Sequence, residues 1–151
     1  MFRSITPLSL DNKGRMAVPA KHRERLAELC AGQLIITIDR DRCLLIYPLP
    51  VWEDVERKLI QLSSTHRRAR SLKRLLMGHA EECAMDAQGR ILLPPPLREF
   101  AGLDKRVVLV GQGNKFELWD EQRWYQLREE WLEEGSDDDD DLPAELESLS
   151  F

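Results

Sequence analysis

The stretch DNKGRMAVPAKHRE, residues 11–24, returns as DAQGRILLPPPLRE, residues 86–99, which lies 75 positions further along the chain. The two stretches share the Asp, Gly and Arg of a D-x-x-G-R pattern, then a Pro and an Arg-Glu pair. Downstream, LIITI (34–38) matches RVVLV, and CLLIYPLPVW (43–52) matches KFELWDEQRW (115–124), both at an offset of 72 residues. Ordered matches of this kind indicate an internal repeat, so the chain is predicted to hold two copies of one small module.

Each copy is predicted to contain four strands and a helix. Short apolar runs between polar turns predict the strands, and Pro19 and Pro94 fit the starts of helices, where the missing amide hydrogen costs nothing. The helix after Pro19 is expected to reach about Leu29, and the helix after Pro94 to be shorter. The predicted strands are 5–10, 15–18, 34–38 and 43–47 in the first copy and 80–85, 90–93, 107–110 and 115–119 in the second.

Leu and Val recur at helical spacing between the copies, which predicts a helical connector. The polar run Ser63 to Thr65 is expected to break this connector and to cap its second half, which Gly78 would end. A further helix is predicted over 120–134. The predicted organisation is a first module (5–52), a helical connector (53–80), a second module (81–124), a helix end (125–134) and an acidic tail (135–151).

The D-x-x-G-R pattern predicts a rigid turn at a hairpin tip in each copy. An Asp at the first turn position caps the following amides, and a Gly at the fourth position takes the positive φ that a short hairpin loop needs. The residues that structure the two turns are Asp11, Gly14, Asp86 and Gly89. Arg15 and Arg90 follow the glycines, and a rigidly held Arg suits a phosphate or a guanine edge in the major groove. The alternative is that each Arg only pairs with its own turn carboxylate.

Charge is distributed unevenly along the chain. The net charge is −5, but residues 133–151 hold nine acidic residues and no Lys or Arg. The other 132 residues keep 18 of the 27 acidic residues and all 22 basic ones, which gives them a net charge of +4. A mildly basic body is therefore predicted to end in an acidic, disordered tail.

Several classes of protein and site are disfavoured by the sequence. No apolar run is long enough to span a membrane, and the N-terminus lacks the apolar core of a signal peptide, so a cytoplasmic location is expected. The three cysteines lack metal-type spacing, and buried apolar filler is their expected role. No metal site, cofactor or catalytic residue is predicted, because no motif assembles a nucleophile with its base.

Two further groups of side chains are open to two interpretations. The basic stretch at 66–74 can bind phosphates, although a solvated face or pairing with acids of a neighbouring subunit is favoured. Phe116, Trp119 and Trp124 can stack on nucleic-acid bases, but packing in a core or interface fits their spacing better.

The sequence resembles the MraZ family, the two-module members of the AbrB-like (SpoVT-AbrB) DNA-binding superfamily. The stretches that carry the resemblance cover about residues 1–132 and are LSLDNKGRMAVPAKHRERL, CLLIYPLPVWEDVERKL, LLMGHAEECAMDAQGRILLPPPLREFAGL and VGQGNKFELWDEQRW. The resemblance implies an α+β fold, a small β-barrel of two tandem swapped-hairpin modules with flanking helices.

The resemblance also implies a function. Members of the MraZ family are transcriptional regulators that form ring-like homo-oligomers. They bind short direct repeats of double-stranded DNA upstream of the division and cell-wall gene cluster that contains their own gene. The DNA-contact residues that the resemblance implies here are Arg15 and Arg90, and Asn12, Lys13 and Gly14 of the first tip are expected to bind DNA with them. Because Gln88 stands where the first copy has Lys13, the first tip is expected to bind DNA more strongly than the second. The resemblance also implies a nucleoid-associated location. The alternative is an antitoxin-like protein that neutralises a protein partner through its tail.

Overall fold

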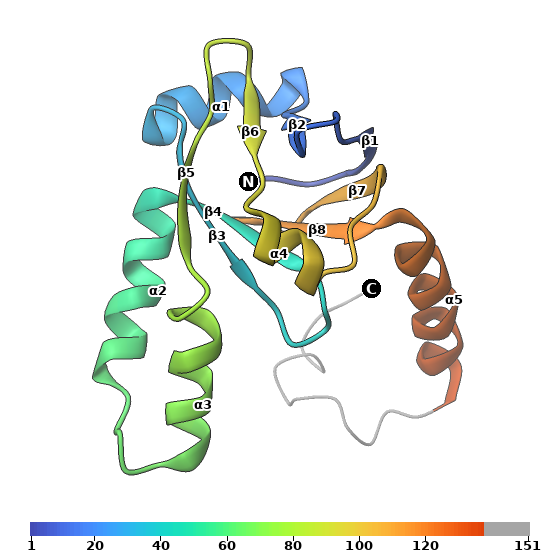
Figure 1. The fold of residues 1–151 in the computed structure, drawn as a ribbon. Helices are drawn as coiled ribbons and strands as arrows, with labels where there is room; N and C mark the ends of the chain where they lie inside the picture. The colour runs from blue at the N-terminus through green and yellow to red at the C-terminus, as the bar shows by residue number, and fades with distance from the viewer. Residues whose placement is uncertain (138–151) are drawn as a thin grey trace. The chain divides into compact units, whose positions relative to one another are not determined.

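The computed structural model describes residues 1–137, which form an α+β protein, and the expected disordered tail lies outside the described residues from position 138 onward. The chain divides into a first unit, Met1–Glu121, and a second unit that begins at Gln122. The first unit holds β1 (Ile5–Ser9), β2 (Arg15–Ala17), α1 (Ala20–Cys30), β3 (Gln33–Ile38), β4 (Leu44–Pro48), α2 (Leu49–Gln61), α3 (Arg67–Leu76), β5 (Glu81–Ala84), β6 (Arg90–Leu92), α4 (Pro95–Phe100), β7 (Arg106–Gly111) and β8 (Phe116–Asp120) (Figure 1). The described part of the second unit lies in α5 (Glu121–Asp137).

The two copies interleave through their strands. A six-stranded sheet has the order β1-β7-β8-β4-β3-β5, and every pairing in it is antiparallel. The first strand of each copy therefore pairs with the third strand of the other copy, as β1 with β7 and β5 with β3. The second strands, β2 and β6, pair only with each other in a separate two-stranded ribbon. Neither copy can complete its sheet without the other.

An approximate twofold axis relates the copies within one chain. Exchanging the elements of one copy for those of the other reverses the strand order of the sheet and leaves every pairing unchanged. Met16 pairs with Ile91, its equivalent in the second copy, at the centre of the ribbon. Leu45 likewise pairs with its equivalent Glu117 where β4 meets β8. The sequence repeat is therefore also a structural repeat.

The expected α+β fold is confirmed, but the expected small β-barrel is not a closed barrel. β1 and β5 each pair on one side only, so the six-stranded sheet is open at both edges. The ribbon forms a separate two-stranded sheet, with three residues in each strand, and does not join the two edges. Backbone hydrogen bonds from Asp11 N to Arg15 O (3.0 Å) and from Asp86 N to Arg90 O (2.8 Å) close the two turns between sheet and ribbon.

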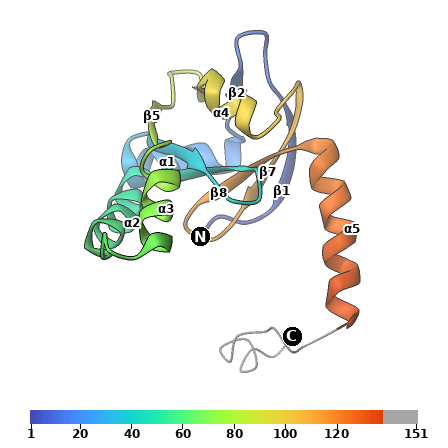
Figure 2. The ribbon, with the colours of Figure 1, turned by 60° about the horizontal axis from the view of Figure 1, so that its bottom comes forward.

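The core lies on both faces of the sheet because buried side chains alternate along β3 and β4. One cluster joins Leu34, Ile36, Ile38, Leu44 and Ile46 to the ribbon, α1 and α4. The other joins Ile35, Leu45 and Tyr47 to α2 and α3, which lie side by side in Figures 1 and 2. The ribbon and the α2–α3 hairpin therefore cover opposite faces of the β3–β4 part of the sheet.

The helices largely follow the sequence predictions, with one correction. Pro19 and Pro94 directly precede α1 and α4, and α4 is the shorter helix, as expected. The predicted break at Ser63 to Thr65 is confirmed, but α3 is capped by His66 without a side-chain hydrogen bond. The Ser63 and Thr65 hydroxyls are 2.7 Å apart and bond to each other instead of capping the helix. None of the helices within residues 1–137 is long and apolar enough to cross a membrane.

Candidate nucleic-acid interface

The first D-x-x-G-R turn is held by the Asp11 carboxylate. Its Oδ1 accepts hydrogen bonds from the backbone amides of Lys13 (2.9 Å) and Arg15 (2.8 Å). Its Oδ2 accepts a hydrogen bond from Nε of Arg15 at 2.6 Å. Gly14 has a φ of 81°, a backbone conformation that would be strained for a residue with a side chain. Its amide donates a hydrogen bond to the Asp11 carbonyl at 3.0 Å. One carboxylate thus shapes the turn and aims the arginine.

The second turn repeats this arrangement. Asp86 accepts bonds from the amides of Gln88 and Arg90, both at 2.9 Å, and from Nε of Arg90 at 3.0 Å. Gly89 has a φ of 77°. Each arginine therefore pairs with its turn carboxylate, as the alternative interpretation expects, and the same carboxylate orients the side chain. Reading of DNA by these arginines stays a prediction.

The carboxylates remain ionised well below neutral pH. The hydrogen bond from the Arg15 amide is the main cause that lowers the pKa of Asp11 to about 2, and the Arg15 side chain adds to it. The corresponding bond from the Arg90 amide lowers the pKa of Asp86. Within each arginine side chain, only Nε donates to the turn carboxylate, and no residue among 1–137 accepts a hydrogen bond from the terminal Nη atoms of Arg15 or Arg90. These atoms are available to a ligand.

The ribbon places both arginines on one face. In its register Arg15 lies opposite Leu92, and Ala17 lies opposite Arg90. Opposed residues of an antiparallel pair point to the same side, so these four side chains share one face while Met16 and Ile91 share the other. Met16 and Ile91 are each 1% exposed, whereas Leu92 is 55% exposed. The outer face therefore carries two diagonal arginines around a small apolar centre.

Each turn is braced by an arginine from the helix of the other copy. Arg23 of α1 donates from Nε to Val18 O (2.6 Å), and Arg98 of α4 donates to Leu93 O (3.2 Å). A methyl group on Gly14 would lie 2.5 Å from Cζ of Arg98, so that guanidinium lies directly against the first turn. Arg23 lies against Gly89 in the same way. Arg23 and Arg98 occupy equivalent positions in the two copies, and this identity is the sequence signal that points to them.

The remaining predicted tip residues are at the surface. Asn12 and Lys13 are exposed in the first turn, as is Gln88 in the second. The loop between β1 and β2 lies beside α4 in Figure 2, and the loop between β5 and β6 lies beside α1 in Figure 1. Because the turns stand at opposite ends of the ribbon, Lys13 adds charge to one end only.

The other candidate residues are not part of this arginine-bearing surface. Phe116 and Trp119 are buried at 2% and 1% exposure, so packing is confirmed for both. Cys43 and Cys83 are buried as expected, and Cys30 is half-buried. Helix α3, which carries most of the basic stretch, has no buried residue. Within residues 1–137, no three His, Cys, Asp or Glu side chains gather closely enough to hold a metal ion.

Taken together, these features define an internally duplicated protein whose two interleaved modules share one arginine-bearing ribbon. The family model of the MraZ protein, described as antitoxin-like, matches residues 1–75 and again 76–143. The chain therefore belongs to the MraZ family. It is 60% identical to the "Transcriptional regulator MraZ" of Halorhodospira halophila over 152 residues, and 60% identical to that of Thioalkalivibrio sulfidiphilus over 151 residues. A protein of the same name from Coxiella burnetii is 53% identical, and in all three comparisons the match covers 100% of both chains.

Proposed function

We propose that this chain is a transcriptional regulator that reads double-stranded DNA with the outer face of the β2–β6 ribbon. The observation that carries the proposal is the pair of arginines on that face, each held through Nε by an aspartate with its Nη atoms available. The major groove admits a two-stranded ribbon, and arginine bonds guanine O6 and N7 in a bidentate way. The similarity to relatives that are named transcriptional regulators supports a role in the regulation of transcription.

The outer face offers different contacts along its length. Arg15 and Arg90 are the proposed guanine readers, and exposed Leu92 between them suits the methyl group of thymine. Exposed Asn12 and Lys13 belong to the proposed first contact, where the lysine ammonium binds a phosphate, and buried Gly14 serves it by shaping the turn. Because Gln88 is neutral, the second turn lacks that phosphate contact, and the first turn contributes more of the affinity.

Several chains acting together complete the proposal. One ribbon supplies few base contacts, so tight binding requires several copies on neighbouring sites, and linked sites raise apparent affinity by about 10²–10⁴. We therefore propose a ring-like homo-oligomer on short direct repeats, upstream of the division and cell-wall gene cluster that contains its own gene. The module boundaries 5–52 and 81–124, and a cytoplasmic, nucleoid-associated location, belong to the same proposal.

Substitution of Arg15 tests this function. Arg15→Ala removes one bidentate contact, which is worth about 1–3 kcal/mol for each subunit, so affinity for the repeats should fall at least tenfold. Arg90→Ala should have a smaller effect. Arg57→Ala is the matched control, because Arg57 pairs with Asp54 on α2, and α2 packs on the face of the sheet opposite to the ribbon. Fluorescence anisotropy on duplexes with and without the repeats measures the change, and circular dichroism checks the fold. Binding by Arg15→Ala equal to that of the unaltered chain would exclude the ribbon as the reader.

The alternative is an antitoxin-like role, which the description of the family model supports. Under that alternative the chain binds a protein partner through its acidic tail. A pull-down from cells with the full chain distinguishes the two roles, because a stoichiometric protein partner together with no protection of upstream DNA in footprinting favours the alternative.

A further inference from the structure

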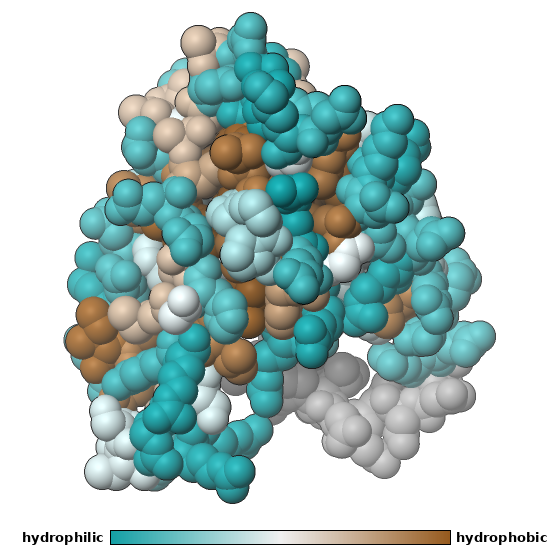
Figure 3. All heavy atoms as spheres, in the orientation of Figure 1, coloured by the Kyte–Doolittle hydropathy of each residue, from teal (hydrophilic) through white to brown (hydrophobic). Residues whose placement is uncertain are grey.

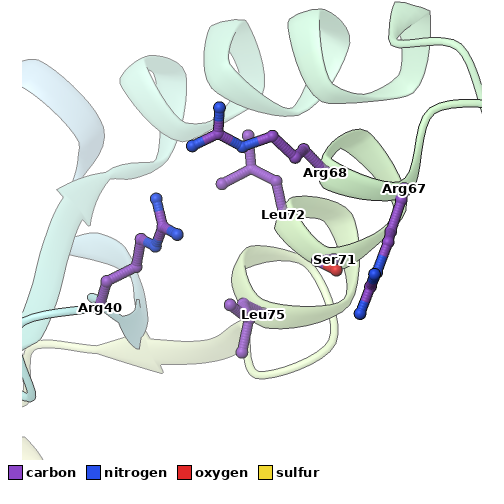
Figure 4. Close-up of a pocket in the computed structure, with 6 residues that line it drawn as sticks. All are labelled: Arg40, Arg67, Arg68, Ser71, Leu72 and Leu75. Atoms are coloured by element: carbon purple, nitrogen blue, oxygen red, sulfur yellow. The ribbon is translucent and has the colours of Figure 1, made fainter.

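A hollow on the α2–α3 side of the sheet is lined by three arginines above an apolar floor. Its volume is about 430 Å³, and its lining residues are Arg40, Arg67, Arg68, Ser71, Leu72 and Leu75. Figure 4 shows the guanidinium groups of Arg40 and Arg68 pointing toward each other across the opening. A smaller hollow of about 200 Å³ shares Arg40, Leu72 and Leu75 and adds Tyr47, Lys115 and the acidic Asp39. The first hollow is therefore the cationic part of this surface, and leucines lie beneath both hollows.

The arginines of this hollow have no anionic partner within residues 1–137. No salt bridge or hydrogen bond is made there by the side chains of Arg40, Arg67 or Arg68. Arg67 and Arg68 also stand in the first turn of α3, where positive side chains oppose the helix dipole, and no acidic residue offsets them. Converging like charges raise the free energy of this surface, and an anionic ligand would lower it.

The hollow is separate from the proposed DNA interface. It is built on α3 and on the turn between β3 and β4, and α3 packs on the face of the sheet opposite to the ribbon. DNA held on the ribbon therefore lies on the other side of β3 and β4. Figure 3 shows mainly hydrophilic side chains over α3 at the lower left, with hydrophobic side chains exposed beside them. This mixture suits a ligand that is both acidic and apolar.

The C-terminal sequence has that composition. Residues 137–141 are five consecutive Asp, Glu145 and Glu147 follow, and no Lys or Arg occurs after Arg128. Leu142, Leu146 and Leu149 recur three and four positions apart, a spacing that lets apolar side chains share one side of a segment. The 14 residues from 138 to 151 span at most roughly 50 Å when extended, enough to reach a neighbouring copy.

We infer that the hollow binds the acidic C-terminal segment of a second copy of this chain. The Asp and Glu carboxylates pair with Arg40, Arg67 and Arg68, while the leucines of the segment cover Leu72 and Leu75. The contact joins two different surfaces and so links copies head to tail. It rests on the proposed homo-oligomer, because the second copy is taken from that assembly.

Photo-crosslinking of the full chain tests the contact and its source. Phe151 is replaced by p-benzoylphenylalanine, and equal amounts of ¹⁵N-labelled and unlabelled chains are mixed before irradiation. Mass spectrometry should find crosslinks from position 151 to residues 67–75, in pairs that join a heavy chain to a light one. High salt should reduce their yield, because exposed ion pairs are screened.

Matched variants decide whether the hollow is responsible. Arg40→Ala with Arg68→Ala should weaken the contact by roughly 2- to 5-fold for each arginine, since exposed ion pairs are individually weak. Leu75→Ser should also reduce the yield, and Arg57→Ala on neighbouring α2 should leave it unchanged. The inference is overturned by crosslinks that map elsewhere, that join only atoms of the same chain, or that survive the double variant. It is also overturned if duplex DNA without repeats displaces the segment, which would make the hollow a nucleic-acid site. Binding of a short single-site duplex should be unaltered in the double variant, so this inference and the proposed function can fail separately.

Discussion

Replacing Gly14 by Ala should destabilise the protein through two separable effects. The first is backbone strain, because Gly14 has a φ of 81° and the left-handed region costs an L-residue about 1–2 kcal/mol. Part of this is offset, because alanine lowers the entropy of the unfolded chain by about 0.4–1 kcal/mol. The second effect is steric. The new methyl group would lie 2.5 Å from Cζ of Arg98 and displace its hydrogen bond to Leu93 O. A hydrogen bond from a charged group is worth about 1.5–3 kcal/mol.

Gly102 provides the matched control for this prediction. Its φ is 62°, and a methyl group there would meet nothing within 4 Å, so Gly102→Ala should cost only the net strain of about 1 kcal/mol. Gly14→Ala should cost about 2–4 kcal/mol, the strain and the lost hydrogen bond together. In an Arg98→Ala background the cost of Gly14→Ala should fall to that of Gly102→Ala.

Urea unfolding at a fixed chain concentration measures these differences, because assembly makes apparent stability depend on concentration. The double-mutant cycle isolates the coupling between Gly14 and Arg98. Equal costs for Gly14→Ala and Gly102→Ala would refute the bracing of the first turn by the second copy. So would a cost at Gly14 that persists unchanged after Arg98→Ala.

Three further outcomes are expected. Burial lowers the pKa of His22 below its ordinary value near 6.5, so the unfolded chain binds the proton more readily than the folded chain. The free energy of unfolding should therefore fall as pH drops below 6.5, and His22→Gln should remove this dependence in urea titrations. The pKa of Asp11 is about 2 against an ordinary 3.8, so its stabilisation should be complete above pH 3.8 and lost as pH falls toward 2, with a carboxyl NMR titration midpoint near 2 as the check. Gln88→Lys should tighten DNA binding and steepen its salt slope by about 1, because the second turn gains a phosphate contact, and an unaltered slope would contradict that role.

The local structure of each copy could be predicted from the sequence, and the partnership of the copies could not. The D-x-x-G-R pattern indicates its own turn, because the bonds that hold it join residues at most four positions apart. Apolar alternation predicts a strand without specifying its partner. β1 therefore reads as half of a hairpin with β2, although it pairs with β7 and β2 pairs with β6. The open sheet follows from these pairings and corrects the expected barrel.

The candidate site was partly predictable for the same reason. Arg15 and Arg90 stand out because each follows a turn glycine, and their pairing with Asp11 and Asp86 is local. The bracing arginine at position 98 acts on a turn 84 positions earlier in the chain, so only its identity with Arg23 in the repeat marks it. The sharing of one ribbon face by Arg15, Leu92 and Arg90 depends on a register between copies, which no local pattern contains.

Duplication within one chain also gives the molecule a direction. Two identical modules around a twofold axis would present two equal turns, and DNA sites that match such symmetry are palindromic. Here the copies have diverged. Gln88 occupies the position in the second copy that Lys13 occupies in the first, and α1 has 11 residues whereas α4 has six. The α2–α3 hairpin with its arginine hollow follows only the first copy. Unequal turns favour sites that repeat in the same orientation. A contact between unlike surfaces, such as a C-terminal segment and the hollow of the next chain, propagates head to tail and closes into a ring when the rotation allows. The broken symmetry of the repeat thus accounts for both proposed features, direct repeats on the DNA and a ring of chains, without requiring a second kind of subunit.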